Sequence, residues 1–304
     1  MTCPRCGCRS DRLTASSSTR GPATDPGSAA SKQSGPTLEL RGIRKRFGVV
    51  QAVDGVDLEL HAGEVHALVG ENGAGKSTLI QIAAGGYQAD AGTIVLRGQE
   101  VRFATPAQAE AAGISVVYQE LSLVPDLDVA ENIYLHREPR RAGIFLDNAQ
   151  MHRVCATFLQ ELGLDIDPRA SVSLLSVAQR QLVEIAKALS READVVIFDE
   201  PTASLGSVEE EHLFGLIGRL RDHGVAVMYV SHRLDEIFAI CDTVTVLKDG
   251  KHVTTVATAE IDHVGLVASM VGRDMAGDLY PPRRPAPRRE AAPLLRVQGA
   301  SSPG

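Results

Sequence analysis

The sequence has no tryptophan and few aromatic residues, since Phe, Trp and Tyr together make up 4% of its 304 positions. Basic residues are not in excess either, because 31 Lys and Arg stand against 38 Asp and Glu, for a net charge of −7. A general nucleic-acid binder needs a basic patch or stripe, so we expect no nucleic-acid partner. No segment approaches the about 18 consecutive apolar residues of a membrane helix, so we expect a chain that does not cross a membrane by itself.

Cysteine is also scarce, and five residues do not make a disulfide framework in a chain of this length. Three of the five lie at Cys3, Cys6 and Cys8, in a pattern that is half of a zinc knuckle. A closed structural zinc site needs four ligands, and no nearby Cys or His supplies the fourth, so we assign this cluster no function. Residues 1–36 are rich in Ser, Thr, Gly and Pro, which predicts a disordered leader.

From Thr37 to Arg273, short β-rich runs alternate with amphipathic helical segments. This alternation predicts an α/β fold with a mostly parallel sheet covered by helices. A stretch of about residues 121–190 has few strand signals before its final helix, which predicts a helical lobe inserted into the sheet domain. The predicted strands are Val53–Leu60, Glu64–Val69, Ile114–Tyr118, Asp194–Phe198, Val225–Val230 and Thr243–Leu247. The predicted helices are Lys76–Ala84, Asn148–Leu162, Val177–Ser190, Val208–Asp222 and Leu234–Ile240.

The C-terminal part of the sequence changes in composition. Residues 274–292 are rich in Pro and Arg, which predicts a stiff, solvated linker. After this linker, Leu295–Gly299 repeats the L-x-[LV]-x-G pattern of Leu38–Gly42. Coincidence is one explanation for so short a repeat. Our hypothesis is that residues 293–304 are the start of a second, similar and truncated domain.

A glycine-rich segment fits the phosphate-binding pattern G-x-x-x-x-G-K-[ST] and lies between a predicted strand and a predicted helix, as this motif requires. Glycines let the backbone fold around phosphates with its N–H groups pointing inward. In this interpretation Lys76 reaches the β- and γ-phosphates and Ser77 ligates Mg²⁺; a merely flexible glycine loop is the alternative. The predicted nucleotide contacts are Gly70, Glu71, Asn72, Gly73, Ala74, Gly75, Lys76, Ser77 and Thr78.

Two adjacent acidic residues, Asp199 and Glu200, follow the apolar run V-V-I-F. In an open α/β sheet the C-terminal strand ends face the ligand crevice, so both carboxylates can point at the phosphates. We predict that Asp199 belongs to the Mg²⁺ site and that Glu200 is catalytic, because it orients and polarises the attacking water. A solvated strand end is the alternative, but the phosphate loop upstream favours the functional interpretation.

With these motifs in this order, the segment from Thr37 to Arg273 resembles an ATP-binding cassette (ABC) transporter ATPase. The resemblance implies a P-loop NTPase fold, an ABC ATPase core that combines a mostly parallel sheet with an antiparallel β-subdomain and an inserted helical subdomain. It also implies ATP and Mg²⁺ as ligands. Gln119 matches the Q-loop glutamine that contacts Mg²⁺ and water, and His232 matches the switch histidine that contacts the γ-phosphate. Phe47 matches the aromatic residue that stacks on adenine.

Residues 175–179 read L-S-V-A-Q where that family has its L-S-G-G-Q signature. The resemblance therefore implies that Ser176 and Gln179 contact the nucleotide of an opposing cassette. Two departures affect the opposing interface. Val177 and Ala178 add side chains where the family has two glycines, and Gly206 replaces an acidic or hydroxyl residue of the D-loop. Neither change touches Lys76.

The segments 118–133 and 175–189 are similar to the N-terminal cassette of monosaccharide importers of the ribose/galactose/xylose group. Members of that group carry two cassettes in tandem. Their hydrolytically competent site pairs the phosphate-binding loop (Walker A motif) of the first cassette with the signature of the second cassette. The resemblance implies an ATP-hydrolysing subunit at the cytoplasmic face of the cell membrane that energises uptake of a monosaccharide. The implied partners are membrane-spanning permease subunits, a second ABC cassette and, through the complex, an extracytoplasmic sugar-binding protein.

Two other functions stay open at this point. One is a soluble ABC ATPase that acts in translation or DNA repair, but such proteins carry long inserted arms or coiled coils, whereas the lobe between Gln119 and Leu175 is transporter-sized. Its Q-loop neighbourhood also predicts an apolar docking surface. The other is a truncated cassette that binds ATP without turnover.

Overall fold

The structure is a computed structural model, and it describes residues 35–119, 121–141, 145–191 and 193–271. Residues 1–34 of the predicted leader, the predicted linker and the expected start of a second domain lie outside these residues. The description below concerns the unit that begins at Gly35. None of the described helices has the length and apolar character needed to cross a membrane.

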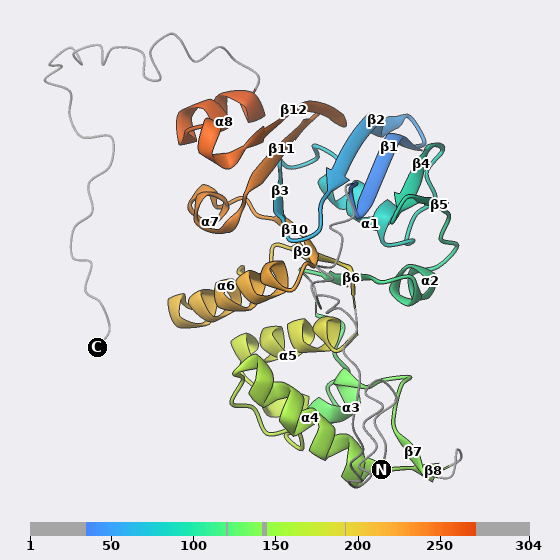
Figure 1. The fold of residues 1–304 in the computed structure, drawn as a ribbon, viewed down its shortest axis with the longest axis vertical. Helices are drawn as coiled ribbons and strands as arrows, with labels where there is room; N and C mark the ends of the chain where they lie inside the picture. The colour runs from blue at the N-terminus through green and yellow to red at the C-terminus, as the bar shows by residue number, and fades with distance from the viewer. Residues whose placement is uncertain (1–34, 120, 142–144, 192, 272–304) are drawn as a thin grey trace, which may run out of the picture. The chain divides into compact units, whose positions relative to one another are not determined.

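The centre of this unit is a six-stranded sheet with the order β12-β11-β3-β10-β9-β6 (Figure 1). Neighbouring strands from β11 to β6 are parallel, and only the edge pair of β11 and β12 is antiparallel. The prediction of an α/β fold with a mostly parallel sheet is therefore confirmed. The strands are β3 (Val65–Val69), β6 (Ile114–Val117), β9 (Val195–Asp199), β10 (Ala226–Val230), β11 (Thr243–Lys248) and β12 (Lys251–Ala257).

A second sheet has four antiparallel strands in the order β2-β1-β4-β5. Its strands are β1 (Leu38–Phe47), β2 (Val50–Leu60), β4 (Ala91–Leu96) and β5 (Gln99–Val101). The resemblance implied such an antiparallel subdomain, so this part of the fold class is confirmed as well. A small hairpin pairs β7 (Arg140–Arg141) with β8 (Phe145–Leu146).

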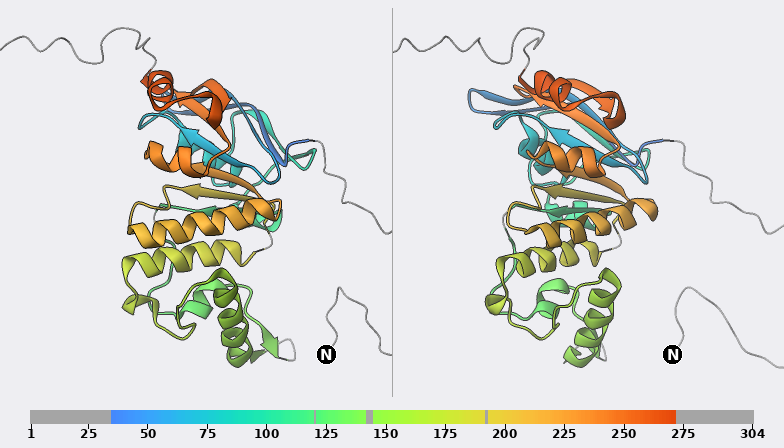
Figure 2. Two further views of the ribbon diagram at one scale, coloured as in Figure 1. Left: turned by 60° about the vertical axis from the view of Figure 1, so that its left-hand side comes forward. Right: turned by 90° about the vertical axis from the view of Figure 1, so that its left-hand side faces the viewer.

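Eight α-helices and two 3-10 helices occur among the described residues. Three of the α-helices lie in the region where we predicted a helical lobe: α3 (Val129–Ile133), α4 (Asn148–Leu162) and α5 (Val177–Leu189). The others are α1 (Lys76–Ala83), α2 (Pro106–Ala111), α6 (Ser207–Asp222), α7 (Leu234–Ile240) and α8 (His263–Val271). The 3-10 helices are η1 (Val172–Leu174) and η2 (Thr258–Glu260). In Figure 2, α5 and α6 both run beneath the central sheet, where α5 contacts β6 and α6 contacts β10.

The alternation of side chains along the central strands divides the core in two. Val196 and Phe198 of β9 face one cluster, which contains the buried side chains of α4, α5 and α6. Val195 and Ile197 face the other, which contains α1 and the antiparallel sheet. Because successive side chains of a strand point to opposite faces, four successive apolar residues, Val195–Phe198, allow β9 to be covered on both sides, as a central parallel strand is.

Candidate functional site

Loops that leave four neighbouring parallel strands meet at one edge of the central sheet. The glycine-rich segment follows β3, Glu200 follows β9, His232 follows β10 and Gln119 follows β6. Since parallel strands end at the same edge, residues far apart in the sequence come together there. A cavity of about 400 Å³ opens at this edge. It is lined by Val50, Gln51, Ala52, Asn72, Gly73, Ala74, Gly75, Lys76, Ser77, Thr78, Gln119, Asp199 and Glu200.

The loop after β3 depends on glycine at its last position before the helix. Gly75 has φ +103°, in the left-handed region, and it is the N-cap of α1. A Cβ atom at Gly75 would lie 2.5 Å from the carbonyl oxygen of Ala52. Both the backbone conformation and the neighbouring strand therefore exclude a larger residue. The helix N-terminus directed at this cavity carries the positive end of the helix dipole, which favours an anion.

The ammonium group of Lys76 lies over this loop. Its Nζ donates to the carbonyl oxygens of Gly70 at 2.7 Å and Glu71 at 3.1 Å. Burial lowers the pKa of Lys76, while the nearby carboxylates of Glu200 and Asp199 oppose this shift. The cation is thus held between loop carbonyls and two acids.

The two acids have different surroundings. Burial raises the pKa of the Asp199 carboxyl, the adjacent Glu200 adds to this, and Lys76 acts in the opposite direction. Glu200 has φ +49°, an uncommon left-handed conformation for a residue with a side chain, and its N–H donates to the carbonyl oxygen of Val230 at 2.9 Å. Its Oε2 lies 3.3 Å from Nδ1 of His232, whose side chain is 67% exposed.

The chemistry of these side chains fits a magnesium nucleotide. Ser77, Gln119 and Asp199 present a hydroxyl, an amide and a carboxyl group to the same cavity. Oxygen ligands of this kind, together with phosphate oxygens and water, are what Mg²⁺ prefers. Lys76 and the N–H groups at the start of α1 can offset phosphate charge on the other side.

Six residues that we predicted to contact nucleotide are not among those that line this cavity: Phe47, Gly70, Glu71, Ser176, Gln179 and His232. The ring of Phe47 is 42% exposed and meets Tyr87 edge to face, with centroids 5.3 Å apart. Ser176 and Gln179 lie at the start of α5, where they form a reciprocal capping box. Gln179 N–H donates to Ser176 Oγ at 3.1 Å, and Ser176 N–H donates to Gln179 Oε1 at 3.0 Å. The resemblance assigned these two residues to an opposing site, so their distance from this cavity does not conflict with that expectation.

Sequence reasoning missed Val50, Gln51 and Ala52, which line the cavity from β2. No motif marks these residues, and the pairing of β2 with β1 holds them in place. The capping box at Ser176 had a readable signal, since Ser followed three residues later by Gln is the pattern of a helix start.

Comparisons with known proteins agree with this geometry. The ABC transporter family model matches residues 53–203. A Burkholderia ambifaria ATP-binding protein named for import of ribose, galactose and methyl galactoside is 51% identical over 274 residues, which cover 89% of this chain and 52% of that protein. The arabinose import ATP-binding protein AraG of Escherichia coli is 46% identical over 274 residues, covering 90% of this chain and 53% of that protein. The chain therefore spans about half the length of these curated relatives.

Solved structures give the same result for the fold. The ADP conformation of an ATP-binding cassette of an ABC transporter matches with a TM-score of 0.67 at 25% identity, over 78% of this chain and 99% of that one. A nucleotide-free cassette from an ABC transporter matches with a TM-score of 0.68 at 24% identity, over 79% of this chain and 96% of that one. The fold, the matched family model and the relatives lead to one conclusion: the chain belongs to the ABC transporter family, as an ATP-binding cassette.

Proposed function

We propose that this chain is the ATP-binding and ATP-hydrolysing subunit of an ABC importer that energises uptake of a monosaccharide. The observation that carries the proposal is the single cavity around which Lys76, Gln119, Asp199 and Glu200 meet. The half-length match to sugar-import ATP-binding proteins supports the choice of substrate class. In this proposal the chain is a peripheral protein at the cytoplasmic face of the cell membrane.

The residues of the cavity have distinct tasks in this function. Lys76 exchanges its present carbonyl partners, those of Gly70 and Glu71, for the β- and γ-phosphate oxygens of ATP. Asp199, Ser77 and Gln119 hold Mg²⁺ and its water, and the bound ion supplies Lewis-acid stabilisation of the charge that develops on the γ-phosphoryl group. Glu200 orients the attacking water for in-line displacement.

His232 completes the site from the next strand. Its contact with Glu200 at 3.3 Å leaves the imidazole beside the position that we assign to the γ-phosphate. Phe47 and the adjacent Tyr87 offer aromatic surface for the adenine. In the same proposal the backbone amides of residues 70–78 and the N-terminus of α1 bind the phosphates.

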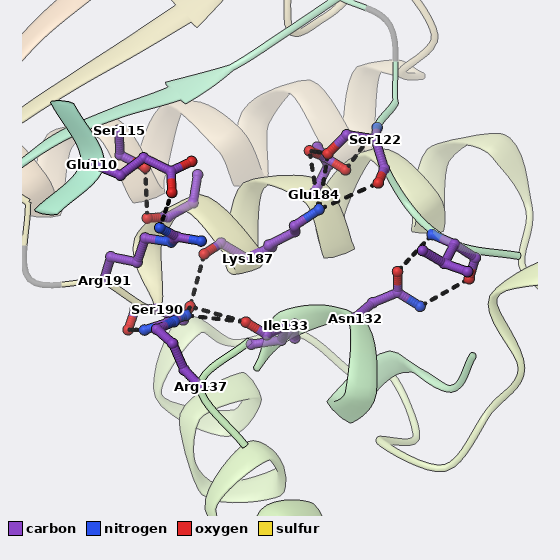
Figure 3. Close-up of polar contacts among 12 residues, drawn as sticks. Glu110, Ser115, Ser122, Asn132, Ile133, Arg137, Glu184, Lys187, Ser190 and Arg191 are labelled. Atoms are coloured by element: carbon purple, nitrogen blue, oxygen red, sulfur yellow. Dashed lines mark hydrogen bonds and ion pairs between the residues drawn. The ribbon is translucent and has the colours of Figure 1, made fainter. Parts of the chain in front are cut away.

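A groove beside the segment that follows Gln119 is the proposed docking site for the permease. The cavity there has a volume of about 220 Å³. Its lining carries Glu110, Glu184, Lys187 and Arg191 as well as apolar side chains, so the surface differs from the apolar one that we expected. Figure 3 shows the side chains of Glu184 and Lys187 both directed at Ser122. A charged surface of this kind selects a partner segment that carries complementary polar groups.

A second ABC cassette is the other proposed partner. Leu174 and Val177, on either side of Ser176, are 85% and 50% exposed. Val208 near the start of α6 is 76% exposed. Apolar side chains around the signature segment are what an opposing cassette would cover. The sugar-binding protein contributes to the complex only through the permease in this proposal.

The test is made in the native cells of the protein. Deletion of the gene is expected to abolish uptake of radiolabelled ribose, galactose or arabinose, and the wild-type gene is expected to restore it. A Glu200→Gln gene is expected to fail, and Glu211→Gln, at an exposed position of α6, serves as the matched control that restores uptake. Unchanged uptake of all three sugars after deletion would contradict the substrate class. ATP binding without any turnover by the assembled complex would contradict the enzymatic part.

A further inference from the structure

The carboxylate of Glu236, in the first turn of α7, accepts hydrogen bonds from three hydroxyl groups, forms an ion pair with Arg233 and is only 1% exposed. Its Oε1 lies 2.8 Å from Thr202 Oγ1 and 2.5 Å from Arg233 Nη1. Its Oε2 lies 2.9 Å from the Tyr229 hydroxyl and 2.6 Å from Ser231 Oγ. An ionised carboxylate has about four acceptor sites, so these donors satisfy it completely.

The donors come from the two segments that carry Glu200 and His232. Thr202 belongs to the turn that begins with Glu200 at the end of β9. Ser231 and Arg233 are the two neighbours of His232 in the sequence, after β10. One buried carboxylate therefore connects both loops, and it is not among the residues that line the cavity with Lys76.

We propose that Glu236 is a positioning residue that sets the spacing between Glu200 and His232 around the γ-phosphate. The inference rests on the proposed function. The proposed role requires no contact between Glu236 and nucleotide, and Glu236 is not among the residues that line the cavity. Its effect passes through Thr202 to the Glu200 turn, and through Ser231 and Arg233 to the His232 segment.

The requirement is for a carboxylate and not only for a residue of this size. All four partners donate, whereas a glutamine side chain has one acceptor oxygen and an NH₂ group that only donates. In Glu236→Gln the NH₂ group must therefore face one pair of donors. Either the Thr202 arm or the Ser231 arm is released, and at a side chain that is only 1% exposed the loss of a hydrogen bond is costly. Arg233 keeps a second acidic partner, since its Nη1 also lies 2.5 Å from Glu210 Oε2.

The first experiment separates turnover from binding in the full chain within the assembled complex. Glu236→Gln is expected to lower MgATP turnover by about 10- to 100-fold, the loss expected when reacting groups are misplaced by about 1 Å. Affinity for a fluorescent ATP analogue is expected to stay within about twofold, because the phosphate loop is untouched. Glu210→Gln removes the other acidic partner of Arg233 and is the matched control, with turnover expected within about twofold of wild type.

A second readout does not depend on hydrolysis. In Glu236→Gln the imidazole NMR resonances of His232 are expected to change chemical shift, while those of His66, buried on β3, stay in place. Ser231→Ala is expected to move the His232 resonances as well, and Thr202→Val is expected to lower turnover. His232→Ala identifies the resonances.

Wild-type turnover in Glu236→Gln, or unmoved His232 resonances in both Glu236→Gln and Ser231→Ala, would overturn the inference. Equal loss of binding and turnover in a variant that keeps its melting temperature would do the same. If Glu236→Gln does not fold, Thr202→Val and Ser231→Ala decide the question, because each removes one donor and leaves the carboxylate in place. If the assembled wild-type complex fails to hydrolyse MgATP, the proposed function is wrong, and the His232 resonances still show whether Glu236 positions that residue.

Discussion

Nδ1 of His232 lies 3.3 Å from Oε2 of Glu200, although the two residues follow different strands of the central sheet. The contact joins the proposed general base to the proposed switch histidine through protein atoms alone. The carboxylate of Glu200 therefore acts from a defined position, and its removal is the most direct test of the chemistry.

Glu200→Gln is expected to bind ATP with near wild-type affinity and to lose turnover by about 100- to 10,000-fold, the usual contribution of a positioned general base. An amide keeps the size of the side chain but accepts protons far less readily. Phosphate release by the assembled complex and binding of a fluorescent ATP analogue measure the two effects. Glu211→Gln, the same change at an exposed site of α6, should behave as wild type. Retained turnover in Glu200→Gln would show that another group prepares the water.

Gly75→Ala is expected to destabilise the fold by about 2 kcal/mol or more and to abolish nucleotide binding, because a Cβ there meets the Ala52 carbonyl oxygen at 2.5 Å in a backbone with φ +103°. Gly98→Ala is the control. Gly98 has φ +76° with nothing within 4 Å, so it measures the backbone cost alone, about 1 kcal/mol. Urea unfolding and nucleotide titration of both variants give the comparison. Similar stability losses in the two variants would mean that the loop can move away from β2.

Substitutions at Ser176 separate its capping role from the expected contact with an opposing nucleotide. Ser176→Ala removes the acceptor for the Gln179 N–H and is expected to cost about 1 kcal/mol of stability. Ser176→Asp keeps an N-cap acceptor, so stability is expected to be retained. Its negative charge opposes a phosphate of the opposing site, so turnover of the assembled complex is expected to fall. Wild-type turnover in Ser176→Asp would contradict the contact with nucleotide.

The thiol of Cys155 is expected to resist alkylation in the native protein. Burial raises its pKa to about 12, and Asp128 adds to the shift. At pH 8 roughly one thiol in 10,000 is then ionised, and the rate of iodoacetamide labelling should rise tenfold per pH unit between about pH 7 and pH 9. An unfolded thiol ionises near pH 8.5, so the unfolded chain binds fewer protons above that pH and this residue lowers stability as pH rises.

Peptide mass spectrometry after timed labelling measures the native rate at Cys155, and the same labelling in urea gives the unfolded control. Cys241 is also buried, and burial raises its pKa in the same direction, so it should behave alike. Equal rates in native and unfolded protein at either residue would contradict the burial.

The strands β9 and β10 could be predicted from the sequence because each carries a short, continuous apolar run. The run Asp194–Phe198 was expected as a strand, and β9 extends from Val195 to Asp199. The phosphate loop was also predictable, because the fixed spacing of Gly70, Gly75 and Lys76 between a strand and a helix allows few other structures. In both places the signal is contained within about ten residues.

The strands that we did not predict carry a weak periodic signal of their own. β12 (Lys251–Ala257) begins with a lysine and a histidine, contains two threonines and is mostly exposed. Its alternation of apolar and polar residues is therefore weak. The strand forms by antiparallel pairing with β11, which precedes it in the sequence. β1 pairs with β2 through several register shifts, which interrupt the period of two on which strand prediction rests. Because the pairing of β1 with β2 could not be predicted, the sequence could not reveal that β2 contributes Ala52 to the wall of the cavity.

The candidate site shows the same limit. The motif residues could be named from their spacing, but the carboxylate of Glu236 could not, because its donors range from Thr202 to Arg233 and only the fold of β9 and β10 brings them together. Phe47 could be selected because it matches the adenine-stacking aromatic residue of the family, yet its contact with Tyr87 across 40 residues is a result of the tertiary structure.

The left-handed backbone of Glu200, at φ +49°, has an evolutionary consequence. A residue with a side chain pays about 1 to 2 kcal/mol to adopt that conformation, whereas Gly and Asn adopt it readily. If selection acted on folding stability alone, substitutions at this position would therefore favour Gly or Asn over an acidic residue. A population that no longer gained from turnover would lose the carboxylate early, while the cassette around it kept its shape and its stability.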